Sequence, residues 1–485
     1  MELANVHDLE AELSRWFGHS GFRNGQRRIV ETAVERTDLL ALLPTSGGKS
    51  ITYQLPAMLG DGITVVASPL VALIKDQFES LPASVRARSV RLDGEMDAVR
   101  CENVRRQLAS GTVRLVYAAP ERLATGVWAE RLLDAGWNRL VVDEAHCIAE
   151  WGHDFRPDYR RLSRWLALRP RMHVMAVTAT ATHATRDEIS AGLGRPLRLL
   201  ETSVFRGNLG IEVVRCRSDE AKQHALLARC VSARTPGIVY VSSRMRAERL
   251  ARLLRSAGCT ALHYHAGMET SERNAVQESF RSGAVRWMVA TVAFGMGVDQ
   301  SDIRTVVHFE PARSLENHVQ EIGRAGRDGK PARCVLFAAP SDLSGFHRRD
   351  RSNRIHFEEA TTLHDALPDP RESMSRRLEI GDGISVMRRE TILGLLEGAG
   401  LVAWRDGAWV RCNPEAGSSQ WDRSERTRVL RSIRRRNQRM ESRSRSMVDF
   451  IRSDQCRHAR IVRYFGDVWN PRTCGNCDRC GLVRV

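Results

Sequence analysis

Short apolar runs alternate with longer amphipathic stretches from residue 25 to residue 340. An apolar run bounded by turn residues predicts a buried strand, and apolar positions recurring every three or four residues predict a helix. Strands alternating with helices favour parallel sheets covered on both faces. The pattern therefore predicts an α/β protein with two parallel-sheet domains in tandem. The expected strands lie at 39–43, 63–68, 113–119, 140–143 and 173–179, and then at 237–242, 261–265, 286–291, 305–309 and 333–338.

Polar residues suited to phosphate chemistry follow several of these strands. Ligands of open parallel sheets bind beyond the carboxyl ends of the strands. The turn Gly47–Ser50 follows the first expected strand and precedes an apolar helical stretch. Gly48, Lys49 and Ser50 match the end of the phosphate-loop pattern G-x-x-x-x-G-K-[ST]. Leu43 stands where the first glycine of that pattern is expected.

The segment Asp143-Glu144-Ala145-His146 ends the fourth expected strand and offers the carboxylates that a phosphate loop needs. Backbone N–H groups of the loop and the start of the following helix would face the phosphates. Lys49 would reach the β- and γ-phosphates, and Ser50 and Asp143 would coordinate magnesium. Glu144 would polarise the attacking water. The alternative is a helix-capping turn beside an unrelated acidic strand end.

The charge balance adds a polyanion as an expected partner. The 485 residues include 74 basic and 58 acidic side chains, which gives a net charge of +16. A basic chain of this size is a candidate polyanion binder, although many basic proteins bind no nucleic acid. No apolar run approaches the ~18 residues of a membrane span. The polar N-terminus does not resemble a signal peptide, so we expect a soluble intracellular protein.

Four of the eleven cysteines gather near the end of the chain, at positions 456, 474, 477 and 480. In an intracellular protein such clustering points to a metal and not to disulfides. Four thiolates close a tetrahedral zinc site and leave no ligand position for water, which favours a structural role. Cys456, Cys474, Cys477 and Cys480 are therefore the expected zinc ligands; the alternative is that one of them is free.

The region 341–445 gives weaker signals. Its segment 356–372 is polar and predicts a linker or loop. Residues 385–404 show apolar positions at near-helical spacing, terminated by Gly398 and Gly400, and Asp406-Gly407 between apolar runs predicts a hairpin. Helix and hairpin form either a winged-helix-like element or a simple packing element. Residues 423–445 hold ten arginines and two glutamates and predict a basic helix, as a DNA contact or as a solvated face.

Several longer segments bear a family resemblance. They include PTSGGKSITYQLPA, VASPLVALIKDQ, YAAPERL, DEAHCIAEWGHDFRPDY, VTATAT and QEIGRAGRDG, in this order. The series resembles that of the RecQ family of superfamily 2 DNA helicases, over about residues 10–340 and 450–485. The resemblance implies two tandem RecA-like domains, at 1–206 and 207–340, an inserted region at 341–445 and a zinc-binding helical module at 446–485. A usual family member has only a short helical link before that module.

The resemblance also implies roles around ATP. Gln26 would bond the adenine edge and Arg23 would stack on the ring, while His19 stands where the family usually has an aromatic residue. Ser46 replaces a glycine of the family's phosphate loop. Gln320, Arg324 and Arg327, in QEIGRAGRDG, are expected to act in catalysis, with both arginines reaching across the interdomain cleft to the γ-phosphate. The ATP-binding residues would then be His19, Arg23, Gln26, Thr45, Ser46, Gly47, Gly48, Lys49 and Ser50.

The same resemblance implies DNA contacts. Trp151, His153, Phe155 and Arg156 would offer stacking faces and a phosphate contact beside the ATP site; the alternative is that Trp151 and Phe155 are core residues. Further phosphate contacts are expected at the ends of strands, from Ser68, Lys75, Ser242, His265 and Thr291.

The expected function is that of an ATP-dependent DNA helicase that moves 3′ to 5′ on single-stranded DNA and unwinds duplexes in repair or recombination. ATP, Mg²⁺ and Zn²⁺ would be its cofactors, and single-stranded and 3′-tailed or forked DNA its partners. We expect a monomer without membrane contact, in the bacterial cytoplasm at the nucleoid. No winged helix follows the zinc cysteines, which favours as one alternative a DNA-dependent translocase with weak unwinding. The other alternative is a zinc-containing DNA-binding regulator with a degenerate ATP site.

Overall fold

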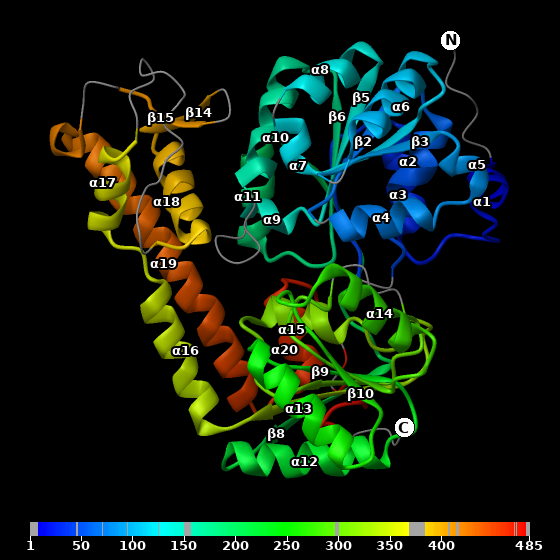
Figure 1. Cartoon of the computed structure of the whole chain (residues 1–485), viewed down its shortest axis with the longest axis vertical. Coiled ribbons are helices and arrows are strands. Elements are labelled where there is room, and N and C mark those ends of the chain that lie inside the picture. The colour runs from blue at the N-terminus through cyan, green and yellow to red at the C-terminus, as the bar shows by residue number, and fades with distance from the viewer. Residues whose placement is uncertain are drawn as a thin grey trace.

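Two parallel sheets, one above the other in Figure 1, form the body of the molecule, and a column of helices runs along one side of both. The structure is a computed structural model. It describes residues 8–44, 47–69, 71–94, 96–124, 126–149, 157–295, 300–367, 384–405, 408–413, 417–469, 471 and 473–481.

The first sheet has seven parallel strands in the order β3-β4-β2-β5-β6-β1-β7. All five strands expected in this part of the chain are present. Every residue of β1, β2 and β4 is buried, as strands covered on both faces require. The two unexpected strands, β3 and β7, are the four-residue edges, and only two residues of each are apolar, which weakens the signal. The strands are β1 (Leu39–Leu42), β2 (Ile63–Ala67), β3 (Ser89–Leu92), β4 (Leu115–Ala118), β5 (Trp137–Asp143), β6 (His173–Thr178) and β7 (Arg198–Glu201).

Helices cover both faces of this sheet. Buried side chains of α2, α3 and α4 pack on one face, and those of α6, α7, α8, α10 and α11 pack on the other. The loops at the carboxyl ends of the strands stay outside these layers and carry the polar residues noted above. The helices are α1 (Leu9–Phe17), α2 (Gln26–Val34), α3 (Ile51–Leu59), α4 (Val71–Glu79), α5 (Ala83–Arg86), α6 (Ala98–Ala109), α7 (Pro120–Ala124), α8 (Val127–Asp134), α9 (His146–Ala149), α10 (Pro157–Leu168) and α11 (His183–Leu193).

The second sheet has six parallel strands in the order β10-β11-β9-β12-β13-β8. The five expected strands are confirmed, and β8 was missed. Helices α12 and α13 cover one face. The strands are β8 (Leu209–Arg215), β9 (Gly237–Tyr240), β10 (Ala261–Tyr264), β11 (Trp287–Ala290), β12 (Thr305–His308) and β13 (Ala332–Ala338), and the helices are α12 (Asp219–Ser232), α13 (Arg244–Ser256), α14 (Thr270–Arg281) and α15 (Leu315–Ile322).

The other face of the second sheet is completed by residues from the end of the chain. Helices α14 and α15 cover part of it, and α19 (Arg423–Arg452) and α20 (Arg457–Tyr464) cover the rest. Met447, Phe450 and Ile461 are buried there with the residues of the sheet. The expected boundary at 445/446 therefore falls inside one continuous helix, because the last turns of α19 belong to the core of the second sheet.

The inserted region is mostly helical. It holds α16 (Pro340–Asn353), α17 (Phe357–Asp365), α18 (Val386–Gly398), β14 (Val402–Arg405) and β15 (Ala408–Arg411). The linker expected over 356–372 is wrong for its first half, which is α17. Ala360 and Leu363 of this helix, and Leu367 just after it, have helical spacing and are buried. Glu359 accepts a hydrogen bond from the backbone N–H of His356 as a capping residue does.

The expected helix and hairpin are confirmed, because α18 is followed by the antiparallel pair β14–β15. Asp406-Gly407 lies outside the described residues. The basic helix is also confirmed. α19 spans 30 residues and runs beside α16 and α18 (Figure 1). None of the described helices is both long and apolar enough to span a membrane.

Side-chain contacts between described residues join the inserted region to the first domain at two places. The guanidinium of Arg161, on α10, lies over the ring of Trp404 at 3.9 Å and near that of Trp409 at 5.3 Å. Arg439, on α19, forms an ion pair with Glu188 on α11. Between these contacts lies a groove lined by basic side chains, including Arg164 and Arg435. The column of helices in Figure 1 is thus attached to helices of the first domain and to the core of the second sheet.

Candidate functional site

The turn Gly47–Ser50 lies between β1 and α3, at the carboxyl edge of the first sheet. Gly48 has a φ of +68°, a left-handed conformation that glycine adopts freely. A Cβ atom at Gly48 would lie 2.4 Å from Nε2 of Gln26. That nitrogen donates hydrogen bonds to the carbonyl oxygens of Gly47 and Gly48, at 3.1 and 2.9 Å. Glycine is therefore required both by the turn and by the close approach of Gln26.

Lys49 and Glu144 form a buried ion pair at the same edge. Nζ of Lys49 lies 2.8 Å from Oε1 of Glu144, and the two side chains are 12% and 9% exposed. Asp143 ends β5 and accepts hydrogen bonds from Nε2 of Gln77, at 2.9 Å, and from the backbone N–H of Glu144, at 3.0 Å. Nδ1 of His146 lies 3.3 Å from Oε2 of Glu144. The structure thus brings together Lys49, Asp143 and Glu144 from two separate strand ends.

The two adjacent carboxyl groups differ in their electrostatics. Burial raises the pKa of Asp143 above its ordinary value, and Glu144 raises it further, although Lys49 opposes both. Burial also raises the pKa of Glu144, but Lys49 and His146 outweigh it, so this pKa lies below its ordinary value. Glu144 therefore keeps its charge, whereas the charge of Asp143 is costly unless a cation lies near it. A divalent cation fits that need, because carboxylate oxygens are its preferred ligands.

The expected adenine-binding residues lie close to this turn. His19 and Arg23 are exposed, and Gln26 is buried at the start of α2. Oε1 of Gln26 accepts a hydrogen bond from the backbone N–H of Arg23 at 2.6 Å. Gln26 thereby links this segment to the phosphate loop, and its contact with an adenine edge stays a prediction. Thr45 and Ser46 lie outside the described residues.

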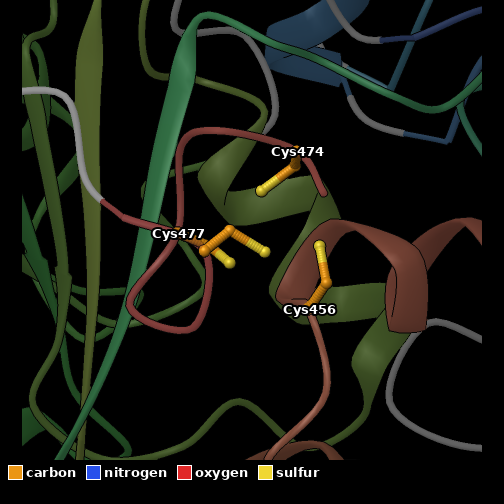
Figure 2. A group of neighbouring side chains, drawn as sticks. Cys456, Cys474 and Cys477 are labelled. Carbon is orange, nitrogen blue, oxygen red and sulfur yellow. The ribbon is translucent and has the colours of Figure 1, made fainter. Parts of the chain in front are cut away.

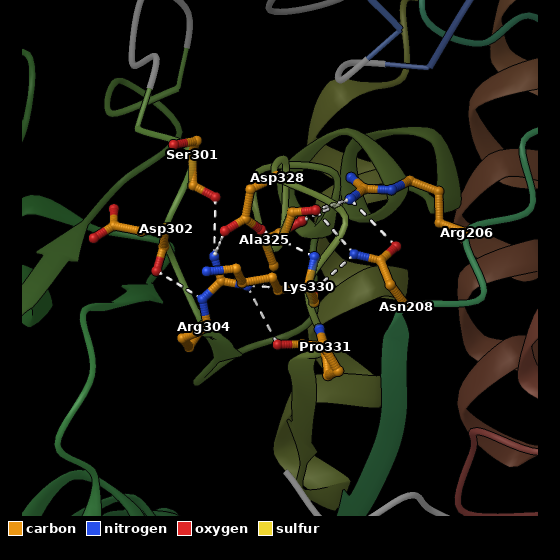
Figure 3. Close-up of polar contacts among 10 residues, drawn as sticks. Arg206, Asn208, Ser301, Asp302, Arg304, Ala325, Asp328, Lys330 and Pro331 are labelled. Carbon is orange, nitrogen blue, oxygen red and sulfur yellow. Dashed lines mark hydrogen bonds and ion pairs between the residues drawn. The ribbon is translucent and has the colours of Figure 1, made fainter. Parts of the chain in front are cut away.

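The segment 323–330, here called the arginine loop, carries Arg324 and Arg327 and is clamped from two sides (Figure 3). Arg206 and Asn208 hold it from one side. Arg304 holds it from the other and pairs with Asp328 at 2.6 Å. Sequence reasoning missed these residues, because they act on backbone carbonyl groups, which have no residue-type signature. The carbonyl acceptors are Gly323 and Ala325 for Arg206, Gly326 and Lys330 for Asn208, and Lys330 and Pro331 for Arg304.

The three expected catalytic residues of the second domain occupy different places. Arg324 is 5% exposed and lies beside Tyr240. Burial raises the pKa of Tyr240 to about 12, although the positive charge of Arg324 acts to lower it. Arg327 is half-buried. Gln320, on α15, lines an apolar pocket between the two domains together with Pro44. Gln320 thus faces the first domain, whereas Arg324 is turned into the second.

The expected DNA-contacting residues are only partly accessible. Lys75 and Ser242 are exposed and Thr291 is half-buried. Ser68 is fully buried in this conformation, and its contact with a DNA phosphate stays a prediction. His265 is 6% exposed, and its Nε2 lies 3.1 Å from Oε1 of Glu248. The aromatic segment expected to bind DNA, with Trp151, His153, Phe155 and Arg156, lies outside the described residues.

The four expected zinc ligands come together, as Figure 2 shows for the three that it labels. The sulfur atoms of Cys456, Cys474, Cys477 and Cys480 all lie within 4.8 Å of one another. Burial raises the pKa of the Cys474 thiol. A bound divalent cation offsets the cost of ionising such thiols. Four sulfurs at this spacing fit a tetrahedral structural zinc.

The cysteine cluster is built onto the edge of the second sheet. The backbone N–H of Asp478 donates to the carbonyl of Ile211, on β8, at 3.0 Å, and Cys477 forms a β-bridge with the same residue. Arg457 is fully buried and bonds both carboxylate oxygens of Asp478, at 2.8 and 2.9 Å. Nε2 of His458 lies 2.9 Å from the carbonyl oxygen of Leu209. The cluster therefore fixes the end of the chain to strand β8.

Three family models match the chain in succession. A DEAD/DEAH box helicase model matches residues 23–189, a helicase conserved C-terminal domain model matches 221–329, and a RecQ zinc-binding model matches 421–481. The matched ranges take in strands β1–β6 of the first sheet, β9–β12 of the second and the cysteine cluster.

Curated relatives share these parts. An ATP-dependent DNA helicase RecQ from Pasteurella multocida is 40% identical over 68% of this chain and 52% of its own length. The chain thus spans about half of that relative, and it spans 53% of the Haemophilus influenzae protein of the same name. The ATP-dependent DNA helicase RecQ of Synechocystis is 32% identical over 99% of this chain and 100% of its own length.

Solved structures support the same fold at low identity. The helicase MrfA, bound to DNA in its structure, has a TM-score of 0.59 and is 18% identical over 84% of this chain and 63% of its own. Helicase Lhr of Mycobacterium smegmatis, bound to single-stranded DNA and AMP-PNP, has a TM-score of 0.54 and is 21% identical over 73% of this chain and 53% of its own. These likenesses show two tandem RecA-like domains.

Proposed function

This chain belongs to the RecQ family of ATP-dependent DNA helicases, and from that premise we propose that it hydrolyses ATP to move 3′ to 5′ along single-stranded DNA and to unwind duplexes. The observation that carries the proposal is the joint placement of Lys49, Asp143 and Glu144 beside the Gly48 turn. A phosphate-binding ammonium, a metal-binding carboxylate and a second, ionised carboxylate are the groups that ATP hydrolysis requires.

The ion pair between Lys49 and Glu144 suggests how nucleotide binding prepares the site. Phosphate oxygens would replace Glu144 as the partner of Lys49, because the ammonium group neutralises phosphate charge. Glu144 would then be free to accept a proton from the attacking water, while His146 keeps the carboxylate in place. The free protein would thus keep its base paired until ATP arrives.

Asp143 and Ser50 are the residues that would hold magnesium. Gln77 and the backbone N–H of Glu144 orient the Asp143 carboxylate, which leaves its remaining lone pairs for a ligand. When bound, the ion neutralises charge on the β- and γ-phosphates. Its binding would also offset the burial that raises the pKa of Asp143.

Arg324 and Arg327 would complete the site from the second domain. Their loop is clamped by Arg206 and Arg304, so domain closure and not loop movement would deliver a guanidinium to the γ-phosphate. A guanidinium there stabilises charge in the transition state. Because Arg324 lies against Tyr240 in this structure, closure would also require that side chain to turn.

DNA would run across both domains. Lys75, Ser242, His265 and Thr291 would contact its backbone, and the segment that contains Trp151 would stack on its bases. The net charge of +16 supports binding to a polyanion. Single-stranded, 3′-tailed and forked DNA would be substrates in repair or recombination. The bacterial relatives support a place at the bacterial nucleoid, and we propose a monomer as the working form.

A DNA translocase with weak unwinding is the second candidate. The placement of the hairpin β14–β15 favours this candidate. A hairpin is the kind of element in the inserted region that could act as a strand-separating wedge. Its Trp404 and Trp409 pack against Arg161 of the first domain. A hairpin occupied in this way would not separate strands unless it first came off α10.

ATP turnover measured with and without single-stranded DNA tests the proposal. We expect DNA to stimulate hydrolysis by the wild-type protein, and we expect Lys49→Ala to abolish both basal and stimulated rates while it still binds DNA. Arg234→Ala, at an exposed basic residue with no proposed role, is the matched control and should hydrolyse ATP normally. Near-normal turnover in Lys49→Ala would refute the assignment of the phosphate loop.

A further inference from the structure

A second group of metal-ligating side chains lies in the second domain, far in the sequence from the cysteine cluster. It consists of Glu248 on α13, His263 on β10, and His265 just after β10. Their ligand atoms all lie within 4.8 Å of one another. None of the roles proposed above for ATP or for the cysteine zinc uses Glu248 or His263.

The fold explains why these three residues meet. Side chains two positions apart on a strand point to the same face, so His263 and His265 are neighbours. Their rings are stacked with centroids 5.3 Å apart and planes inclined by 27°. Helix α13 packs against β10, which places Glu248 beside them. Oε1 of Glu248 lies 3.1 Å from Nε2 of His265.

One atom of the group has an unmet need. Nδ1 of His265 is buried and has no hydrogen-bond partner among the described residues. A buried nitrogen without a partner costs free energy. His263 is half-buried, and Glu248 retains 39% of its side-chain exposure. The group is therefore reachable from solvent on the Glu248 side while both imidazoles are held by the strand.

We propose that Glu248, His263 and His265 form a binding site for a divalent transition metal, with Zn²⁺ as its expected occupant. Two imidazoles and one carboxylate are a known zinc ligand set that leaves a fourth position for water or another ligand. Imidazole ligands select zinc, nickel, copper or cobalt over Mg²⁺ and Ca²⁺, which prefer oxygen. A single carboxylate also supplies too few oxygen ligands for Mg²⁺ or Ca²⁺.

The site has a consequence for DNA, which rests on the proposed function. His265 is an expected contact of the DNA backbone, and a bound metal would occupy a ring nitrogen that could otherwise donate to a DNA phosphate. Zinc would then weaken DNA binding through the second domain. The four-cysteine cluster would be untouched, because it is a separate ligand set at strand β8.

Metal stoichiometry tests the site without reference to activity. The full-length protein is equilibrated with excess Zn²⁺, passed over a desalting column, and analysed for metal and for protein. We expect two zinc ions per chain in the wild type and one in His263→Ala, with the remaining ion in the cysteine cluster. His224→Ala, at an exposed histidine of α12, is the matched control and should keep two. One zinc in the wild type, or two in His263→Ala, would overturn the site.

A second variant guards against a folding artefact. Glu248→Gln keeps the size of the side chain but removes its charge, and we expect zinc at this site to bind about tenfold or more weakly in calorimetric titration. Unchanged affinity would exclude Glu248 as a ligand and contradict the proposal.

Single-stranded DNA affinity is then measured with and without Zn²⁺. Zinc should weaken binding by the wild type and leave His263→Ala unaffected; equal effects on both would overturn the competition with DNA. A protein that binds the second zinc but shows no DNA-stimulated ATP turnover would contradict the proposed function and leave the metal site standing.

Discussion

The nucleotide site and the cysteine cluster are both assembled from segments far apart in the sequence, yet they depend on the fold in opposite ways. Lys49 and Glu144 are 95 positions apart and meet because strands β1 and β5 of the same sheet end at the same edge. That sheet has its own apolar core and holds them without needing their charges. The cysteines, in contrast, lie in a short segment that packs at the edge of the second sheet, where Cys477 joins the apolar core.

The nucleotide site therefore serves the reaction, and the cysteine cluster serves the stability of the fold. In the nucleotide site, the charges of the buried Lys49–Glu144 pair are not needed for folding. They serve the ligand, because Lys49 would exchange Glu144 for phosphate oxygens when ATP binds. At strand β8 the ligand itself would hold the chain together, since binding free energy of a structural zinc is folding free energy. A substitution in the first site should therefore lower turnover without unfolding, and a substitution in the second should do the reverse.

Cys477→Ser should have the largest effect on stability. Cys477 is fully buried beside Ile211, and loss of one ligand should release the zinc and cost about 3 kcal/mol or more of unfolding free energy. Zinc content and thermal unfolding measure this. Cys412→Ser, at an exposed cysteine, should change neither. A Cys477→Ser protein of normal stability and zinc content would show that the cluster is not a scaffold.

Lys49→Ala should have the opposite profile. Turnover of ATP should fall at least ~100-fold, or about 2.7 kcal/mol of barrier, because phosphate charge loses its partner. Its zinc content should remain normal, since the cysteine cluster lies on the other sheet. Loss of zinc from this variant would mean that the two regions are not independent.

Lowering the pH should destabilise the second domain, which carries the cysteine cluster, by a smaller amount of free energy. Burial lowers the pKa of His318 well below its ordinary value, and His308 and Arg457 lower it further. The unfolded chain therefore binds more protons, so stability is complete above about pH 6.5 and falls as the pH drops below it. In the His318→Phe variant the new ring would pack against Phe450. Between pH 7 and pH 5 this variant should lose about 1–2 kcal/mol less unfolding free energy than the wild type. Equal losses, measured by denaturant unfolding, would contradict this.

The basic helix α19 shows the same contrast within one run of arginines. Arg436 is buried and donates to the carbonyl of Asn353 at 2.6 Å, so it is scaffold. Arg434 and Arg435 are exposed. Neutralising these two to Gln should flatten the salt dependence of DNA affinity by up to about two units. Arg436→Gln should lower stability instead. An unchanged slope in the double variant would make this face of α19 a solvated surface only.

Sequence patterns predicted what is local and missed what is tertiary. The phosphate loop, Asp143 and the cysteine spacing are short patterns tied to specific chemistry, and the buried strands carry strong apolar runs. Strands β3 and β7 lie at sheet edges, where that signal fades. Helix α17 was read as a linker because its charged residues hid the spacing of Ala360, Leu363 and Leu367.

The clamp on the arginine loop had no signal at all. Arg206 and Arg304 bind backbone carbonyl groups that only the folded chain brings near them. The burial of Arg436 within an arginine run was equally invisible, because the neighbours that cover it come from α16, many positions away.

Strand displacement on a 3′-tailed duplex tests the central claim most directly. The wild-type protein, with ATP and Mg²⁺, should separate the 3′-tailed duplex and leave blunt and 5′-tailed duplexes paired, and Lys49→Ala should separate none of them. Hydrolysis of ATP stimulated by DNA without any displacement would contradict the helicase and favour the translocase. Displacement of the 5′-tailed duplex alone would contradict the proposed direction.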